Sequence, residues 1–300
     1  MRKRTKKKLI KALVWLVVAV IVAVAGWFIG KDYLAGPTVE PVSGDEVEIH
    51  FIDVGQGDAA LIRTAAGNVL IDTSTGSAED QLKAYLDLMG VKDIEYAILT
   101  HPDEDHIGGA DMVFANYNVK HVILPEITVS TAAYRNMDEG IKAEEGCVRI
   151  SPEPNMTFQV GEVKFTVLAP LDDSYKDVND HSVVLRMDYG ETSILFTGDA
   201  EAASEKDMLE RYGASDWLDC DILKVGHHGS ETSSCEAFLK EVTPDYAVIS
   251  AGEGNRYQHP RPATLDRLAA LGIPYYRTDT QGSIVFSTTG GEPVPETPAA

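Results

Sequence analysis

The sequence predicts an α/β fold of stacked, mixed β-sheets with helices on the outside, joined to one N-terminal transmembrane helix. Three observations lead to this prediction. Strand-like apolar runs recur along the chain, helical patterns alternate with them, and one run near the N-terminus carries no charge. The 300 residues are 44% hydrophobic and 24% charged, a globular composition that excludes a mostly disordered chain.

The N-terminal segment begins with a basic head, MRKRTKKKLIK, which is followed by residues 12–30 without a charged side chain. A helix of that length spans about 28 Å, close to the hydrocarbon thickness of a bilayer. Basic residues before the run and Asp32 after it predict a cytoplasmic start and an extracytoplasmic body. We expect residues 1–31 to anchor the chain in the cell membrane as a single-pass helix. The alternative is a signal peptide cleaved between Ala25 and Gly26, which would give a secreted protein.

The rest of the chain divides into three parts. Residues 32–45 contain glycine, proline and serine without periodicity, so we expect a linker there. Residues 288–300 have a similar composition and are expected to be a flexible tail. No break rich in proline and serine divides residues 46–287, which we take as one domain.

Apolar periodicity defines the elements of this domain. The strand-like runs are 47–54, 59–64, 68–73, 96–101, 121–126, 163–169, 182–189, 193–199, 221–227, 246–252 and 283–288. The helical patterns are 77–89, 107–116, 131–143, 201–211, 233–241 and 263–271. The segments GQGD at 55–58 and YGET at 189–192 predict hairpin turns between successive strands.

The formal net charge of −21 combines two different parts of the chain. Residues 1–31 hold eight basic residues and no acidic one, which leaves 18 basic against 47 acidic residues, a net charge of −29, for residues 32–300. Such an acidic body repels polyphosphate, so a protein that coats nucleic acid through a basic face is excluded. An enzyme with a local, metal-centred site is compatible with this charge.

Residues 100–109, THPDEDHIGG, follow an apolar strand and precede a helix, so they form a strand-to-helix loop. Two imidazoles and two carboxylates lie within six residues, at His101, Asp103, Asp105 and His106. Divalent cations bind this mixture of nitrogen and oxygen donors. The two glycines that end the segment allow close backbone approach. We interpret the loop as a metal site rather than as a solvated acidic loop.

Further polar side chains lie at the ends of later strands. Asp199 closes the run SILFTGD, and KVGHHGS places His227 and His228 directly after an apolar run. Neighbouring side chains on an extended segment point in opposite directions, so we expect at most one of these two histidines to bind metal. His181 begins another strand, and His259 lies in the loop RYQHPRP, where it is a candidate for substrate contact.

The segments LIDTS, HPDEDHIGG, LFTGDAE and KVGHHGS occur in the order typical of the metallo-β-lactamase superfamily, which this sequence resembles. FIDVGQGDAALI, together with HPDEDH and VGHHGS, is similar to the hydrolase domain of the DNA-internalisation competence protein ComEC and its stand-alone relatives. The resemblance covers about residues 46–287. It implies a four-layer αββα sandwich, two metal ions in a cleft at the strand ends, and hydrolysis by a metal-bound hydroxide.

The resemblance also implies ligands for each metal ion. His101 and Asp103 would bind the first ion, Asp105 and His106 would bind the second, and Asp199 would bind both. The superfamily usually has a histidine at the position of Asp103. The carboxylate is a harder ligand, which lowers the preference of the site for Zn²⁺ and favours Mn²⁺ or even Mg²⁺. We expect two divalent ions, Zn²⁺ or Mn²⁺.

Further roles follow from the same resemblance. Either His227 or His228 would complete the second site; we take His227 as the ligand and His228 as a contact to a leaving or equatorial oxygen, with His259 as a second contact. His181 stands where related sequences commonly have asparagine, and it could add a nitrogen ligand to the first site. Asp72, in LIDTS, would hold the metal loop by hydrogen bonds.

Together these observations predict a membrane-anchored, extracytoplasmic, metal-dependent hydrolase of the phosphodiesterase or nuclease type. Lys224 or a nearby histidine would stabilise charge on the equatorial oxygens, and Asp105 would accept a proton from water. A smaller phosphodiester, such as a phospholipid or wall-polymer head group, fits the acidic body better than DNA does, but no motif in the sequence points to it. The alternatives are a lactam or ester hydrolase of the same fold and a non-catalytic metal-binding module. Asp103 argues against typical lactamase chemistry, and the full ligand set argues against a non-catalytic module.

Overall fold

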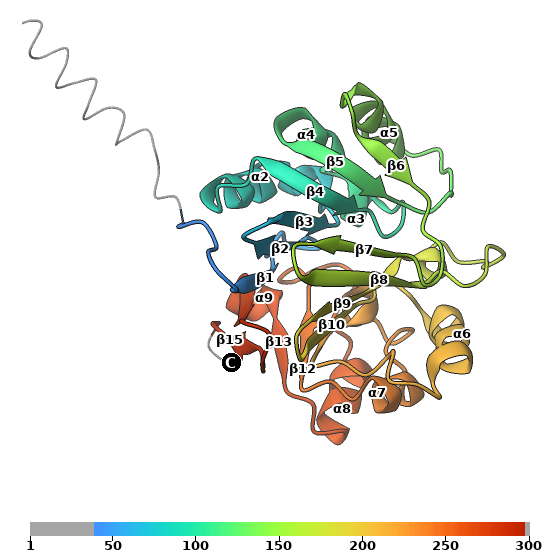
Figure 1. The fold of residues 1–300 in the computed structure, drawn as a ribbon. Coiled ribbons are helices and arrows are strands. Elements are labelled where there is room, and N and C mark those ends of the chain that lie inside the picture. The colour runs from blue at the N-terminus through green and yellow to red at the C-terminus, as the bar shows by residue number, and fades with distance from the viewer. Residues whose placement is uncertain (1–38, 298–300) are drawn as a thin grey trace, which may run out of the picture.

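Two β-sheets face each other in the computed structural model, which describes residues 39–297, and helices cover their outer faces (Figure 1). The first sheet has the order β15-β14-β1-β2-β3-β4-β5-β6, and the second has the order β13-β12-β11-β10-β9-β8-β7. The strands of the first sheet are β1 Val47–Phe51, β2 Ala60–Thr64, β3 Gly67–Ile71, β4 Asp93–Ile98, β5 Asn118–Ile123, β6 Val148–Ile150, β14 Ile284–Thr288 and β15 Val294–Pro295. Those of the second are β7 Thr157–Val160, β8 Val163–Ala169, β9 Val184–Tyr189, β10 Thr192–Phe196, β11 Ile222–Lys224, β12 Tyr246–Ile249 and β13 Tyr275–Arg277.

The helices divide between the two sheets. Their bounds are α2 Glu79–Leu88, α3 Glu104–Ile107, α4 Ala110–Asn116, α5 Ala132–Ala143, α6 Ala202–Tyr212, α7 Glu236–Val242, α8 Pro262–Ala270 and α9 Thr278–Gln281. Helices α2, α4 and α5 pack on the first sheet, where Leu82 shares an apolar core with Leu70 of β3. Helices α6, α7 and α8 pack on the second sheet, where Phe238 shares a core with Leu223 of β11.

A third apolar core lies between the two sheets. Alternate residues of each strand face it, because side chains on a strand point to opposite faces in turn. Val69 and Ile71 of β3 therefore belong to this core, while the residue between them faces the helices. Phe51 of β1 contacts Phe196 of β10 across the layer, with ring centroids 5.7 Å apart. The predicted two-sheet α/β architecture with outer helices is thus confirmed.

All eleven predicted strand runs and all six predicted helical patterns overlap an element of the same type. The predicted YGET turn closes the β9–β10 hairpin, with Gly190 at φ 59°. Four observed strands were not predicted: β6, β7, β13 and β15. They are the four edge strands of the two sheets. Edge strands are short and partly exposed, so they lack the apolar run that marks an interior strand.

The predicted flexible tail is wrong for residues up to 297. Within the tail, Val294 and Pro295 pair with β14, and the Glu296 amide donates a hydrogen bond to the Val285 carbonyl at 2.8 Å. The Thr192 hydroxyl also donates to the Gly291 carbonyl. The physical reason is that β14 would otherwise present an unpaired edge, whose backbone groups the tail satisfies despite its low hydrophobicity.

The described part of the predicted linker also lies against the domain. The Val39 amide donates to the Leu88 carbonyl at 3.1 Å, and Arg63 donates to the Glu40 carbonyl at 3.1 Å. The predicted anchor at residues 12–30 lies outside the described residues. Within residues 39–297, no helix combines the length and apolar character needed to cross a bilayer.

Candidate metal centre

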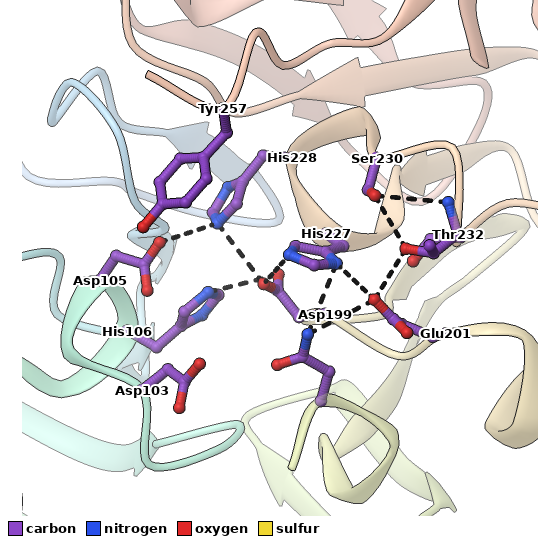
Figure 2. Close-up of polar contacts among 12 residues, drawn as sticks. Asp103, Asp105, His106, Asp199, Glu201, His227, His228, Ser230, Thr232 and Tyr257 are labelled. Carbon is purple, nitrogen blue, oxygen red and sulfur yellow. Dashed lines mark hydrogen bonds and ion pairs between the residues drawn. The ribbon is translucent and has the colours of Figure 1, made fainter. Parts of the chain in front are cut away.

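The candidate site lies at the carboxyl ends of parallel strands from both sheets. In the first sheet, β3 and β4 run parallel and are followed by Asp72 and His101. In the second, β10 and β11 run parallel and are followed by Asp199 and His227. Because parallel strands end at the same edge of a sheet, these side chains meet in one place. Figure 2 shows the histidines and carboxylates converging there.

Backbone contacts fix the metal loop, residues 100–109, in place. The Thr73 amide donates to the His106 carbonyl at 2.7 Å. A Cβ atom on Gly108 would lie 2.3 Å from the Gly76 nitrogen, and one on Gly109 would lie 2.4 Å from the Thr73 carbonyl oxygen. Side chains are therefore excluded at both positions, and the close approach predicted from the two glycines is confirmed.

Asp72 connects the loop to the sheet. Its carboxylate accepts hydrogen bonds from the Thr100 amide and hydroxyl, both at 2.7 Å, and from His106 Nδ1 at 2.8 Å. Burial raises the pKa of Asp72, and the contact with His106 opposes this shift. Because Nδ1 is occupied, His106 presents Nε2 to the site, where it lies 3.3 Å from Asp199 Oδ1.

We expect Asp72→Asn to weaken divalent-metal binding by about 10- to 100-fold, the usual effect of losing a partner that orients a metal ligand. An amide has one acceptor oxygen and cannot accept from Thr100 and His106 as the carboxylate does. Calorimetric titration with Mn²⁺ measures the change. Asp221→Asn is a matched control. Asp221 also accepts hydrogen bonds from a backbone amide and a hydroxyl, both of Ser193. It precedes β11, however, and so lies at the end of that strand away from the site. An equal loss of affinity in both variants would contradict the assignment.

Four donor atoms at the centre are buried without a hydrogen-bond partner: Nε2 of His101, His106 and His228, and Oδ1 of Asp199. Their side chains are at most 4% exposed. Buried polar atoms are almost always paired, so four unpaired atoms in one place need an explanation. Four sets of donor atoms each lie within 4.8 Å of one another within the described residues. Two sets contain residues of the metal loop other than His106 alone: His101, His106 and Asp199, and Asp105, His106 and His228. The other two contain Asp58, with Asp72 and His106 or with Asp199 and His228. Such grouping is the arrangement expected of ligands for more than one cation.

His227 and His228 do not point in opposite directions, and the prediction that they would is wrong. Both residues adopt left-handed backbone angles, with φ 48° and 53°, whereas the prediction assumed an extended segment. Nε2 of each ring consequently lies 3.6 Å from Asp199 Oδ2. The two differ in their other contacts. His228 is buried and donates from Nδ1 to the Ser250 carbonyl, whereas His227 is one-quarter exposed and donates to Glu201.

Asp58 is a member of the site that sequence analysis missed. Asp58 Oδ2 forms an ion pair with Lys224 Nζ at 2.6 Å, and its Oδ1 lies 3.4 Å from His228 Nδ1. Both side chains of the pair are less than 8% exposed. Lys224 also donates to the Val225 carbonyl, so it supports His228 through Asp58. This position is compatible with the role outside the metal ligands that we expect for Lys224 and Asp72, and it does not fit contact with an equatorial oxygen. The available signal was the aspartate at the end of GQGD, which was interpreted only as part of a turn.

The remaining predicted residues occupy different positions. Asp103 is half-exposed, and its Oδ2 lies 3.9 Å from His101 Nε2. Asp105 is one-quarter exposed and lies 3.3 Å from His228 Nε2. His259 is half-buried at the rim of the site, with its ring centroid 5.3 Å from that of His227. By contrast, His181 directs Nε2 to the Tyr175 carbonyl at 3.0 Å and does not join the grouped donor atoms.

The charges of the site favour cations. Burial opposes protonation of His228, but the carboxylates of Asp199 and Asp58 outweigh it and raise its pKa to about 10. Burial also disfavours the charged form of Asp105, yet its contact with His228 lowers its pKa to about 2. His101 differs, because burial and the neighbouring His106 lower its pKa to about 3 and keep the ring neutral. Since ligands bind metal in their deprotonated form, cations would take the place of protons here.

These donors fit divalent metal ions. The set combines neutral or deprotonatable imidazole nitrogens with carboxylate oxygens, the chemistry that Zn²⁺ and Mn²⁺ accept. The Nδ1 atoms of His106 and His228 are each held by an acceptor, which leaves Nε2 for a metal.

Comparisons with known proteins agree with this geometry. Residues 52–253 match the family model described as Metallo-beta-lactamase superfamily. The chain is similar to "ComE operon protein 3" of Bacillus subtilis, with 32% identity over 266 residues and 83% of this chain covered. It is also similar to "Competence protein ComA" of Neisseria gonorrhoeae, with 33% identity over 253 residues and 84% covered. Each match spans 34% of the relative, so the chain corresponds to about a third of those proteins.

Solved structures share the fold at low sequence identity. The metallo-beta-lactamase fold protein YhfI from Bacillus subtilis superposes with a TM-score of 0.56 at 11% identity, covering 82% of this chain and all of that chain. CmlA, described as a diiron beta-hydroxylase from Streptomyces venezuelae, gives a TM-score of 0.52 at 14% identity, covering 79% of this chain and 53% of that chain. Both likenesses concern the fold alone.

Proposed function

Because this chain belongs to the metallo-beta-lactamase superfamily, we propose that it is a hydrolase that cleaves phosphodiesters at a centre of two divalent metal ions. The observation that carries the proposal is the group of four buried, unpaired donor atoms on His101, His106, His228 and Asp199. Two of the similar proteins are named for competence and for recombination, which supports a phosphodiester over a lactam as the substrate.

The donor positions suggest how the ligands divide. His101 and Asp103 would hold one ion, and Asp105, His106 and His228 would hold the other. Asp199 presents its two oxygens to different histidines, so it would serve both ions. In this assignment His228 replaces His227 as the ligand, and His181 takes no part. When bound, divalent ions acidify water and polarise a phosphoryl oxygen.

The protein's own groups would complete the reaction. Asp105 is one-quarter exposed at the cleft, less than Asp103 but more than the buried Asp199. Its carboxylate can therefore accept a proton from water there. Burial opposes protonation of His227, but the hydrogen bond from Nδ1 to Glu201 at 2.8 Å outweighs it and raises the pKa of the ring. The protonated ring presents Nε2 beside Asp199 and can donate a hydrogen bond from it to a substrate oxygen. His259 lies beside both histidines and can contribute a second contact.

We also propose that the enzyme works outside the cytoplasm, tethered by residues 12–30. The charge-free run with a basic head supports this orientation. The acidic body further suggests that the substrate is held by contacts at the cleft and not by a broad electrostatic field.

Substrate comparison tests the proposal. The purified chain, supplied with Mn²⁺ or Zn²⁺, is expected to hydrolyse methyl p-nitrophenyl phosphate and to leave a chromogenic lactam intact. Addition of a chelator should remove the activity, and restoring the metal should return it. Hydrolysis of the lactam without the phosphodiester would contradict the proposed substrate class. Failure to hydrolyse either would favour a non-catalytic role.

A further inference from the structure

A cleft of about 550 Å³ adjoins the metal centre, and its two walls differ in chemistry. One wall carries Asp103 and Asp105 of the metal loop. The opposite wall carries Arg256 and Tyr257, from the loop that follows β12. A substrate bound at the metal centre would therefore extend past the guanidinium of Arg256 and the ring of Tyr257.

This second loop is held without help from Arg256 or Tyr257. The Asn255 side chain donates to the Gly252 carbonyl at 2.9 Å and accepts from the His259 amide at 3.0 Å, so it ties the two ends of the loop together. Gly252 packs so closely on Gln56 that a Cβ atom would lie 2.5 Å from the Gln56 nitrogen. The side chains between these anchors are free to serve a ligand.

Arg256 and Tyr257 form a flat, cationic surface. The guanidinium carbon lies 4.6 Å from the centroid of the Tyr257 ring, and the guanidinium also donates to the tyrosine hydroxyl. The tyrosine is 41% exposed. Within residues 39–297, Arg256 forms no ion pair with a carboxylate. An exposed aromatic ring beside a guanidinium that has no carboxylate partner suits a ligand with a planar ring and a phosphate.

The surface is adjacent to the donor atoms. The Tyr257 ring centroid lies 5.7 Å from that of His259, which in turn lies 6.4 Å from that of His228. Figure 2 shows Tyr257 above Asp105 and beside His228. A ring stacked at this surface would thus neighbour a phosphodiester bound at the metal centre.

We propose that Arg256 and Tyr257 bind the base of an unpaired nucleotide whose phosphodiester is cleaved at the metal centre. This inference rests on the proposed phosphodiesterase function and adds a nucleoside as the group recognised. Bases stack on aromatic and guanidinium faces with little sequence preference, because every base has a π-face. Local stacking also provides affinity that the acidic body cannot provide through a basic groove. A double helix hides its base faces, so the ligand is an unpaired strand or a strand end.

Two substrates with one leaving group test the proposal: thymidine 5′-(p-nitrophenyl phosphate) and methyl p-nitrophenyl phosphate. They share the nitrophenyl ring and differ in the nucleoside. The wild-type chain should show a KM for the nucleoside ester lower by about tenfold, the effect expected of one stacked base. Tyr257→Ala and Arg256→Ala should each abolish this preference, so that the two esters have the same KM. Tyr257→Phe, which keeps the ring, should retain it.

Matched controls remove similar groups elsewhere. Trp217→Ala removes the other exposed aromatic side chain of residues 39–297, which precedes β11 and so lies away from the cleft. Lys240→Ala removes an exposed cation on α7. Both should keep the nucleoside preference. Equal KM values for the two esters in the wild type, or a preference that survives Tyr257→Ala, would overturn the proposal while leaving the phosphodiesterase function intact.

If neither ester is hydrolysed, the proposed phosphodiesterase function is contradicted. A binding measurement then still tests whether Arg256 and Tyr257 bind an unpaired base. Fluorescence anisotropy at low ionic strength compares a six-residue oligothymidylate with an abasic strand of equal length. Ca²⁺ is present as an oxygen-preferring cation for the cleft carboxylates. The oligothymidylate should bind about tenfold more tightly, and Tyr257→Ala should remove the difference. Equal affinity of the wild-type chain for both strands would overturn the inference.

Discussion

Replacing Asp199 with asparagine is expected to remove phosphodiester turnover and to lower metal content. The carboxylate lies 3.3 Å from His106 Nε2 and 3.6 Å from Nε2 of both His227 and His228, so one substitution affects both proposed metal positions. Mutation of a residue that only hydrogen-bonds to a metal ligand lowers activity by up to about 100-fold. The loss of kcat/KM in Asp199→Asn should be larger than this. Elemental analysis of the purified chain and initial rates with methyl p-nitrophenyl phosphate measure the two effects.

Asp216→Asn is the control for this substitution, because Asp216 is exposed and lies in the segment before β11, away from the strand ends that carry the site. It should keep both metal content and turnover. If Asp199→Asn kept its metal and its rate, the proposed centre would be wrong. If it kept metal but lost its rate, Asp199 would act on the substrate and not as a shared ligand.

Replacing Lys224 with methionine is expected to destabilise the fold by about 3–5 kcal/mol, the usual cost of leaving one member of a buried ion pair without its partner. Asp58 would remain in the interior with a negative charge, beside a cluster that already holds several carboxylates. Urea denaturation followed by circular dichroism measures the free energy of unfolding. Metal binding should also weaken, since Asp58 would no longer be held against His228.

A double variant separates the charge effect from the loss of packing. Lys224→Met combined with Asp58→Leu replaces both charges with apolar groups, and it should be more stable than Lys224→Met alone. Lys240→Met is the matched control, because Lys240 pairs with Glu236 on the exposed face of α7 and should change stability little. A Lys224→Met variant as stable as the control would contradict the role given to the buried pair.

Sequence periodicity predicted the interior strands well, because interior strands such as β8 and β10 are mostly apolar and buried along most of their length. The four edge strands escaped prediction because half-exposed residues such as those of β7 have no distinctive pattern. The packed tail escaped for a similar reason, since it is held by backbone pairing with β14 and not by apolar side chains.

The metal loop could be predicted because His101, Asp103, Asp105 and His106 lie within six residues. Asp58 could not, because its significance arises from contacts with side chains far away in the sequence. Residue types also do not reveal backbone conformation. The left-handed angles of His227 and His228, which turn both rings toward Asp199, became apparent only in three dimensions.

Metal titration of the wild-type chain tests the central claim most directly. The metal-free protein is supplied with increasing Mn²⁺, and bound metal and phosphodiester turnover are measured on the same samples. Turnover should rise with bound metal and level off at two ions per chain, as expected if the ions occupy the donor sets on His101, His106, His228, Asp105 and Asp199. Full turnover in the metal-free, chelator-treated protein, or no bound metal at saturating Mn²⁺ and Zn²⁺, would contradict it.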